Sequence, residues 1–264
     1  MIRQTQQGGK GLRENAETYG ICAFADVADR LLPCAAQKRL PADAKSILLY
    51  VFPYRFPETE TRTLSRYACV NDYHQVVGNI LRVMADACKA RHPAYQFEPF
   101  VDNSPIPEVY AAAKAGLGVI GKNGLLIHPT YGSYVFIGEI VTDMPLKTTG
   151  GEIQTCCNCG ACITACHGGC LPDSRDTCVS AITQKKGELT EEEIALIRKN
   201  GLIWGCDRCQ EVCPHNKDAK IDPHPYFNSF TPHFIENDPD FQKRAYAWRG
   251  EAVIRRNIDI LEDI

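Results

Sequence analysis

Residues 156–167 read C-C-N-C-G-A-C-I-T-A-C-H, and residues 205–214 read G-C-D-R-C-Q-E-V-C-P. The first run spaces four of its cysteines as C-x2-C-x2-C-x3-C, and the second spaces three as C-x2-C-x3-C-P. Spacing, cysteine count and the closing Pro214 together indicate iron–sulfur chemistry.

The first spacing is that of two-cluster bacterial ferredoxins, in which three cysteines bind one [4Fe–4S] cube and the fourth binds the other. Each iron needs one thiolate, so two cubes need eight, and the two runs supply seven. Cys178 lies between the runs and is the best candidate for the eighth ligand. Crossing over assigns the first cluster to Cys156, Cys159, Cys162 and Cys213, and the second to Cys166, Cys178, Cys206 and Cys209.

Two other interpretations of the cysteines explain less. A structural zinc takes four ligands, usually from two separated C-x2-C pairs, and would leave several thiols without a role. Disulfides need an oxidising compartment, and residues 1–15 contain no apolar run of the kind found in a signal peptide. We therefore expect a cytoplasmic protein.

Length and composition set broad limits. The chain has 264 residues, 44% hydrophobic and 23% charged, which suits one large globular domain or two small ones. A formal net charge of −3 excludes a globally basic surface for nucleic acid. No apolar run approaches the length of a membrane span.

Sequence periodicity predicts several elements. The apolar run S-I-L-L-Y-V-F-P predicts a buried strand. Asn71 or Asp72 can cap a helix with an apolar stripe. Thr190 and Glu193 form a capping-box pattern. The expected elements are strands at 46–53, 124–128 and 134–142, with the last two joined by a turn, and helices at 72–91, 108–115, 190–201 and 247–261.

Two features between these elements invite a functional interpretation. Gly116, Gly118 and Gly121 spell G-x-G-x-x-G, but a helix precedes the motif and a strand follows it, which is the wrong context for dinucleotide binding. We expect a glycine loop that lets backbone approach a large ligand closely. Asp102 lies just before a predicted helix, where an aspartate is commonly a turn or capping residue.

Several motifs in order resemble the cobalamin-dependent, two-cluster epoxyqueuosine reductases. Besides the cysteine runs they are R-Y-A-C-V-N-D-Y-H at 66–74, D-N-S-P-I-P-E at 102–108, A-G-L-G-V-I-G-K-N-G-L-L-I at 115–127, G-S-Y-V-F-I-G-E-I at 132–140 and D-T-C-V-S at 176–180. The resemblance covers roughly residues 44–216, and the sequence after residue 245 resembles the family more weakly.

The resemblance implies an α+β chain in three parts. Residues 1–150 would form a cobalamin-binding α/β domain related to the nitroreductase fold. Residues 151–220 would form a ferredoxin-like module with two [4Fe–4S] clusters, in which Cys178 matches the family's isolated ligand. Residues 221–264 would form a C-terminal tail with a short helix.

The resemblance also implies a mechanism. A low-potential donor of flavodoxin or ferredoxin type would pass electrons through both clusters to cobalamin, which would deliver them to an epoxide carbon. Asp102 matches the family's proposed proton donor. A free aspartate titrates near ~3.9, so a donor at neutral pH needs a raised pKa, which a dry pocket provides.

The resemblance of these motifs to the family also implies which residues line the cobalamin cleft. Each has a plainer alternative: His74 as a core histidine bonded to backbone, and Lys122 as a solvated loop lysine. The residues expected to line the cobalamin cleft are Arg66, Tyr67, Tyr73, His74, Lys122, Asn123, Ser133 and Tyr134.

The chain also departs from the family pattern. The sequence ends at Ile264, so we expect a short form without most of the C-terminal helical-repeat domain that helps to hold tRNA. His167 replaces a proline, and the roles of Cys157, Cys170 and His215 stay open.

The leading hypothesis is therefore a cytoplasmic reductase of the epoxyqueuosine reductase type, which acts on tRNA or on a related small molecule. A ferredoxin-like electron carrier would explain the cysteines without cobalamin. A cobalamin-reactivating protein would need both cofactors and no substrate. No membrane partner is expected.

Overall fold

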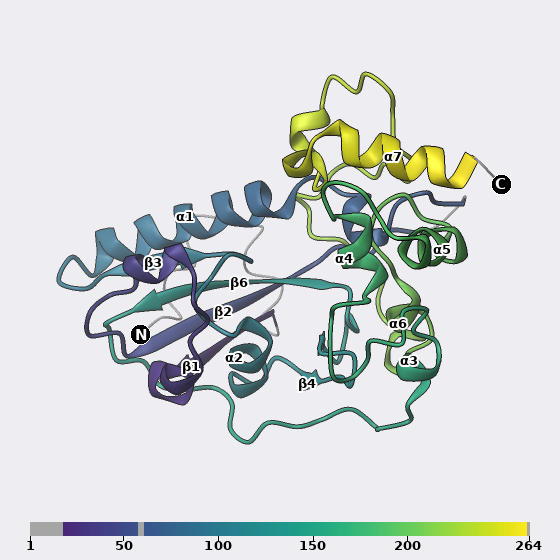
Figure 1. Cartoon of the computed structure of the whole chain (residues 1–264). Helices are drawn as coiled ribbons and strands as arrows, with labels where there is room; N and C mark the ends of the chain where they lie inside the picture. The colour runs from purple at the N-terminus through teal and green to yellow at the C-terminus, as the bar shows by residue number, and fades with distance from the viewer. Residues whose placement is uncertain (1–17, 58–60, 263–264) are drawn as a thin grey trace.

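The computed structural model describes residues 18–57 and 61–262, so the polar segment 1–17 lies outside the described residues. An antiparallel sheet with helices on both faces lies beside a group of short helices (Figure 1). The strands are β1 (Tyr19–Ala23), β2 (Ser46–Pro53), β3 (Phe97–Phe100), β4 (Val119–Ile120), β5 (Leu126–Ile127) and β6 (Val135–Thr142). The α-helices are α1 (Tyr73–Arg91), α2 (Glu108–Lys114), α3 (Ala161–Thr164), α4 (Val179–Thr183), α5 (Glu191–Asn200), α6 (Arg208–Glu211) and α7 (Glu251–Glu262).

The main sheet has the strand order β1-β2-β6-β3, and every neighbouring pair is antiparallel. Its two central strands, β2 and β6, are eight residues long and almost entirely buried, as expected for strands covered on both faces. The strand predicted at 46–53 is confirmed with the same bounds.

Helix α1 covers one face of the sheet (Figure 1). Asp72 caps it by accepting a hydrogen bond from the amide of His74, 3.0 Å away, as the sequence predicted. Val77 and Leu81 pack closely over Gly138 in β6, where an added Cβ would lie 2.8 and 2.7 Å from their side chains. The helix therefore approaches the strand closely because position 138 has no side chain.

Helix α2 covers the opposite face, and its three buried alanines pack on Ile137 and Val141 of β6. Successive side chains of a strand alternate between faces, so Glu139 points to the same side as Ile137 and Val141. This alternation places an acid under α2, in the middle of an apolar core.

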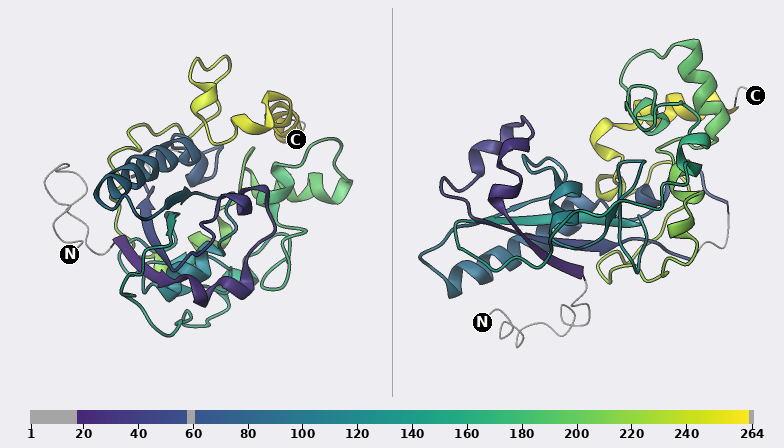
Figure 2. Two further views of the ribbon diagram at one scale, coloured as in Figure 1. Left: turned by 90° about the vertical axis from the view of Figure 1, so that its left-hand side faces the viewer. Right: turned by 90° about the horizontal axis from the view of Figure 1, so that it is seen from below.

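The iron–sulfur segment carries the short helices α3 to α6. Thr190 and Glu193 form the predicted capping box at the start of α5, and Gly201 ends that helix with φ 73°. Figure 2 shows α5 and α7 side by side. Trp204, Tyr246 and Ile254 belong to one apolar cluster, so the C-terminal segment packs on the iron–sulfur segment. The three-part division at 150 and 220 stays a prediction.

Some elements differ from the prediction, and β4 and the short helices α3, α4 and α6 were not predicted. Strand β5 pairs with β4 in a separate two-stranded sheet, so it forms no hairpin with β6. Strands β1 and β3 were not predicted, because such short strands show no clear periodicity. Helix α7 starts at Glu251 and not at residue 247, because Gly250, with φ 82°, separates it from the 3-10 turn Ala247–Arg249. In the described part of the chain, no helix has the length and apolar content needed to span a membrane.

Candidate functional site

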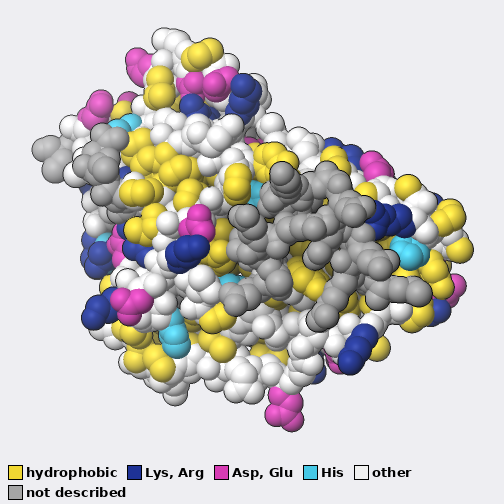
Figure 3. All heavy atoms as spheres, turned by 180° about the vertical axis from the view of Figure 1, so that it is seen from behind, with side chains coloured by type: hydrophobic (Ala, Val, Ile, Leu, Met, Phe, Trp, Pro, Cys, Tyr) yellow, Lys and Arg dark blue, Asp and Glu magenta, His cyan; other side chains and the backbone are white. Residues whose placement is uncertain are grey.

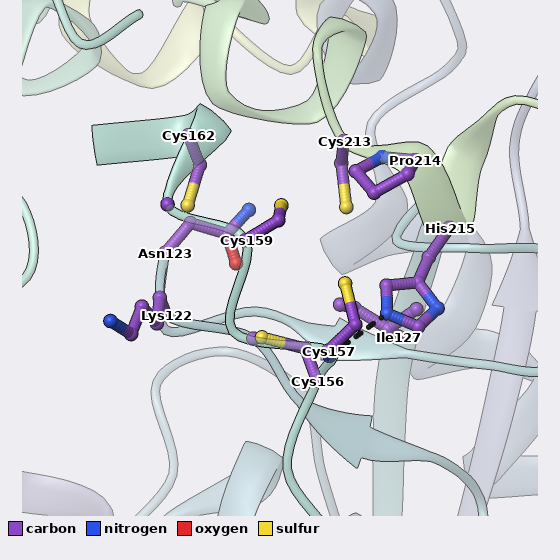
Figure 4. Close-up of a pocket in the computed structure, with 12 residues that line it drawn as sticks. Lys122, Asn123, Ile127, Cys156, Cys157, Cys159, Cys162, Cys213, Pro214 and His215 are labelled. Carbon is purple, nitrogen blue, oxygen red and sulfur yellow. Dashed lines mark hydrogen bonds between the residues drawn. The ribbon is translucent and has the colours of Figure 1, made fainter. Parts of the chain in front are cut away.

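The first predicted cysteine set lies around one space. Cys156, Cys159, Cys162 and Cys213 line it together (Figure 4). Burial raises the pKa of the Cys213 thiol, and its neighbours Cys162, Cys159 and Cys156 add to the rise. Residues 57 positions apart in sequence therefore meet at this space, as crossing over between the two runs requires.

The second predicted set meets around Cys178, the residue that precedes α4. Burial raises the pKa of Cys206 to about 12 and that of Cys209 to about 11, and Cys178 is among the neighbours that add to both rises. Cys178 also adds to the rise in the pKa of Cys170, and the sulfur of Cys170 lies 3.5 Å from that of Cys166. Cys178 thus links the two cysteine runs.

Three of the residues left open lie beside these sets. Cys157 lines the first space, and its amide donates a hydrogen bond to Nε2 of His215 over 3.3 Å (Figure 4). Cys170 is buried next to Cys166. Within the described ranges, no three His, Cys, Asp or Glu side chains are close enough to bind a single metal ion. The sulfurs of the first set instead lie around one open space, where the sequence predicts a cube.

Lys122 and Asn123, both predicted to contact cobalamin, line the first cysteine space (Figure 4). Asn123 is buried, and its amide lowers the pKa of Cys209 in the second set. Arg175 donates a hydrogen bond to the Asn123 carbonyl over 2.5 Å. These contacts place the two residues between the cysteine sets, and their contact with cobalamin stays a prediction.

Asp102 lies in the loop before α2 with φ 55°, a left-handed conformation that aspartate tolerates better than most residues. The residue that precedes α2 is Pro107, and no side chain caps this helix, so the capping interpretation of Asp102 is wrong. Its carboxylate instead binds Nε2 of His74 over 3.1 Å, and its charge adds to the rise that burial causes in the pKa of Tyr73.

His74 lies between two carboxylates. Its Nδ1 is 2.7 Å from Asp72, and its Nε2 is 3.1 Å from Asp102, so the alternative of a core histidine bonded to backbone is wrong. Burial opposes protonation, but the hydrogen bonds to Asp102 and Asp72 raise the pKa of His74 to about 9. The hydrogen bond from His74 lowers the pKa of Asp102. The proton of this pair therefore lies on His74, opposite to the raised aspartate pKa expected from the sequence.

A small open cavity of about 90 Å³ lies next to this group, since Tyr73 and Glu108 line it. Tyr73, Glu108, Ser133 and Phe136 are among its lining residues. The rings of Tyr73 and Phe136 stack 4.2 Å apart at 5°, and His74 stacks on the other side of Tyr73. Both faces of the Tyr73 ring are therefore covered by other rings, and the cavity is lined by a mixture of apolar and polar side chains.

The remaining predicted residues connect the sheet to the iron–sulfur segment. Arg66 pairs with Glu211 at 3.0 Å and lies over the ring of Tyr134. The Tyr67 hydroxyl accepts a hydrogen bond from Trp204 over 2.8 Å. Ser133, which also lines the cavity, accepts hydrogen bonds from Gln210 and Asn216. The structure brings only Tyr73, His74 and Ser133 of the predicted pocket residues to the cavity or to Asp102.

Sequence reasoning missed the acids around Asp102. Asp72 was expected only as a helix cap, and Glu108 and Glu139 were given no role. A signal was present at both glutamates: Glu108 ends the D-N-S-P-I-P-E motif, and Glu139 interrupts an otherwise apolar strand. A charged residue inside such a strand is rare unless it is paired or functional.

Comparison with known proteins identifies the family. The family model described as "Epoxyqueuosine reductase QueG, DUF1730" matches residues 35–103, and that of the "4Fe-4S double cluster binding domain" matches residues 155–216. The curated epoxyqueuosine reductase of Lactococcus garvieae is 32% identical over 248 residues, which cover 82% of this chain and 68% of that protein. The chain belongs to the epoxyqueuosine reductase family.

Other members of the epoxyqueuosine reductase family agree. The protein of Cellulophaga algicola is 32% identical over 83% of this chain and 78% of its own length. A solved epoxyqueuosine reductase bound to an epoxyqueuosine-modified tRNA stem loop is 26% identical, with a TM-score of 0.77 over 92% of this chain and 76% of that one. The chain spans 65% of the Bacillus subtilis relative and 50% of the Escherichia coli relative.

Family membership and the double-cluster match support the cofactors expected from the sequence, two [4Fe–4S] clusters and a cobalamin. The solved relatives also share the α/β content and the 4Fe-4S binding domain of this fold.

Proposed function

We propose that this protein is a cobalamin-dependent reductase that converts the epoxide of epoxyqueuosine in tRNA, or of a closely related substrate, to an alkene. The eight predicted cysteines would hold the two clusters in the sets given above. Asp102, with His74, would supply a proton to the substrate oxygen.

The observation that carries the proposal is the Asp72–His74–Asp102 chain at the cavity. It joins the D-Y-H and D-N-S-P-I-P-E motifs through contacts of 2.7 and 3.1 Å. An electron carrier needs no such proton-holding group beside a cavity. The chain combines this group with two sets of cysteines, which suits a reaction that consumes both electrons and protons.

The residues at the cavity fit a cobalamin. Apolar side chains such as Leu126 and Ile137 line the cavity and suit the hydrocarbon parts of a corrin ring, and the Ser133 hydroxyl suits a polar group on its rim. When bound, the cofactor supplies a low-potential metal that transfers electrons to the substrate. The finer relationship of this domain to the nitroreductase fold is part of the proposal.

The proposed reaction consumes electrons and protons, which the protein must deliver. An epoxide that becomes an alkene takes up two electrons and two protons, and its oxygen leaves as water. The first proton is needed as the C–O bond breaks, because an alkoxide is a poor product at neutral pH. The imidazolium of His74, whose pKa lies near 9, would pass its proton to Asp102 across their 3.1 Å contact, and Asp102 would give it to the substrate oxygen.

Partners and compartment follow from the same chemistry. The clusters require a low-potential donor of flavodoxin or ferredoxin type, and thiols in this number suit the reducing cytoplasm. Where Figure 3 shows described side chains, Lys and Arg are scattered among Asp and Glu, and this visible part forms no broad basic field for tRNA. We propose that tRNA, if it is the substrate, is held by local contacts near the cavity.

The test is turnover with defined components. Anaerobic protein with reconstituted clusters and cobalamin is mixed with a chemical reductant and an epoxyqueuosine-modified tRNA stem loop, and the modified nucleoside is measured by mass spectrometry. We expect queuosine to form. Asp102→Asn should lower the rate by about 10²–10⁴-fold, because the amide cannot donate a carboxylic proton.

The matched control is Asp86→Asn, which changes an exposed acid of α1 away from the cavity and should leave the rate unchanged. Cluster absorption without any cobalamin retained in excess cofactor would contradict the proposal and favour the electron carrier. Retained cobalamin without turnover of the stem loop would favour another substrate or a reactivating protein.

A further inference from the structure

Glu139 is a fully buried acid in the centre of the sheet. It lies in β6 between Leu49 of β2 and Phe100 of β3, and its side chain is 0% exposed. Neither of its carboxyl oxygens has a hydrogen-bond partner among the described residues. A charged carboxylate in such a place is very costly, so this group is held as the neutral acid.

Glu108 is the first residue of α2, on the face of the sheet to which Glu139 points. It lines the cavity beside Tyr73, while its Oε2 is buried and has no partner within the described residues. Both acids lie on the α2 side of the sheet, the charge of Glu108 adds to the rise in the pKa of Glu139, and the charge of Asp102 raises the pKa of both. Glu108 therefore connects the buried acid to the cavity.

Neither glutamate forms an ion pair with Lys or Arg in the described part of the chain. Burial raises the pKa of Glu108 to about 8, Asp102 adds to the rise, and His74 opposes it. Burial also raises the pKa of Glu139 well above its ordinary range, with a contribution from Glu108. The Ser104 hydroxyl, which approaches without reaching hydrogen-bonding distance, opposes that rise.

We propose that Glu108 and Glu139 form a buried pair of carboxylic acids that stores a proton and returns it through Glu108 to Asp102 during turnover. This inference rests on the proposed function. It gives a role to two acids whose burial costs stability, since neither forms an ion pair with Lys or Arg in the described structure.

The proton count of the reaction calls for such a store. Two protons enter the leaving water, and the Asp102–His74 pair holds one. Tyr73 lines the cavity together with Glu108, and it precedes His74, whose Nε2 contacts Asp102 over 3.1 Å. A proton passes from Glu108 to Tyr73 as the Tyr73 proton passes to Asp102. Glu108 then becomes the carboxylate, Asp102 becomes the acid, and no electrons move. Glu139 stays neutral and keeps the charge of Glu108 unfavourable, which favours reprotonation from solvent.

The first measurement needs neither substrate nor cofactor. Infrared difference spectra between pH 6 and pH 10 report the C=O stretch of protonated carboxyl groups. We expect Glu108→Gln to remove a band that titrates near pH 8 in the wild type, and Glu139→Gln to remove a band that persists and to shift the Glu108 titration to lower pH. Glu152→Gln, an exposed loop position, is the matched control. The inference is overturned if neither variant removes a band at pH 7.

The second measurement is single turnover of the proposed substrate as a function of pH. Glu108→Gln should slow the proton-dependent step about 10-fold or more and remove the fall in rate above pH 8, and Glu108→Asp should restore part of the rate. Wild-type rate and pH profile in Glu108→Gln would overturn the inference while the proposed function stands. Failure of the wild type to turn over the substrate would instead contradict the proposed function, and the infrared bands would still decide whether the acid pair exists.

Discussion

Asp102 and His74 act as one proton-binding unit at the edge of the cavity. The imidazole is 36% exposed and lies between two carboxylates at 2.7 and 3.1 Å. Each carboxylate stabilises the imidazolium, so His74 is protonated at neutral pH although part of it is buried. The protonated ring in turn keeps Asp102 ionised in the absence of substrate.

Replacing Asp72 should show how much its charge raises the pKa of His74. Asp72→Asn keeps a good N-cap for α1 but removes one of the two negative charges, so the pKa of His74 should fall from about 9 towards 6.5. An NMR titration of the imidazole resonances measures this shift.

The raised pKa of His74 makes the folding stability of the protein depend on pH. The folded-state pKa of His74 lies above its unfolded value of 6.5, so its contribution to stability is complete below pH 6.5 and is lost as pH rises through 9. Asp72→Asn should reduce the stability difference between pH 6 and pH 9.5, and Asp86→Asn should not. An unchanged His74 titration in Asp72→Asn would contradict the contact.

At the scale of elements, helix α5 holds the second cysteine run beside the first. Its start is fixed by the reciprocal bonds of Thr190 and Glu193, and its end by Gly201 in a left-handed conformation. Ile197 is fully buried in a small apolar cluster with Ile182 and Ile260, so the helix is anchored between α4 and α7. Cys206 follows five residues after its end.

Removing the cap should weaken this helix. Thr190→Ala should lower the free energy of unfolding by about 1 kcal/mol, because the amide of Glu193 loses its acceptor. Thermal unfolding under anaerobic conditions, with hydrogen exchange of α5, measures the effect. Thr148→Ala, at an exposed loop position, is the control, and Thr190→Ser should recover most of the loss. Equal stability of Thr190→Ala and Thr148→Ala would mean that packing alone fixes the helix.

At the scale of the whole molecule, the C-terminal helix is tied into the iron–sulfur segment. Asn257 of α7 is fully buried, and its amide donates hydrogen bonds to the carbonyls of Thr183 and Ile203 over 2.8 and 2.7 Å. Val253 and Ile254 pack on Trp204 from the same helix. The contacts span more than 50 residues of sequence and bring α7 against both α4 and the approach to the second cysteine run.

Loss of Asn257 should therefore destabilise the iron–sulfur segment and not only the tail. Asn257→Ala leaves two buried carbonyls without a donor and should cost about 2–4 kcal/mol. The loss of iron–sulfur absorbance during denaturant unfolding should shift to lower denaturant concentration. Asp259→Ala, at an exposed position of the same helix, should shift it little. If cluster loss were insensitive to Asn257→Ala, residues 221–264 would behave as a separate tail.

The local elements were largely predictable because their signals are local. The strand at 46–53, the cap at Asp72 and the capping box at Thr190 follow from periodicity and from side chains within three residues. Strands β1, β3 and β4 are five residues or fewer, and their periodic pattern is too short to predict a strand.

The sequence by itself determined the cysteine spacing, and with it the prediction of two iron–sulfur clusters, because ligand intervals are a property of the chain. It also marked Asp102 and His74 by their motifs. Only the tertiary structure decided where the proton lies. Protonation depends on burial and on charges within a few ångströms, and these come from α1, the loop before α2 and the centre of β6. The same distance dependence makes Glu108 and Glu139 a pair that no local sequence pattern could reveal.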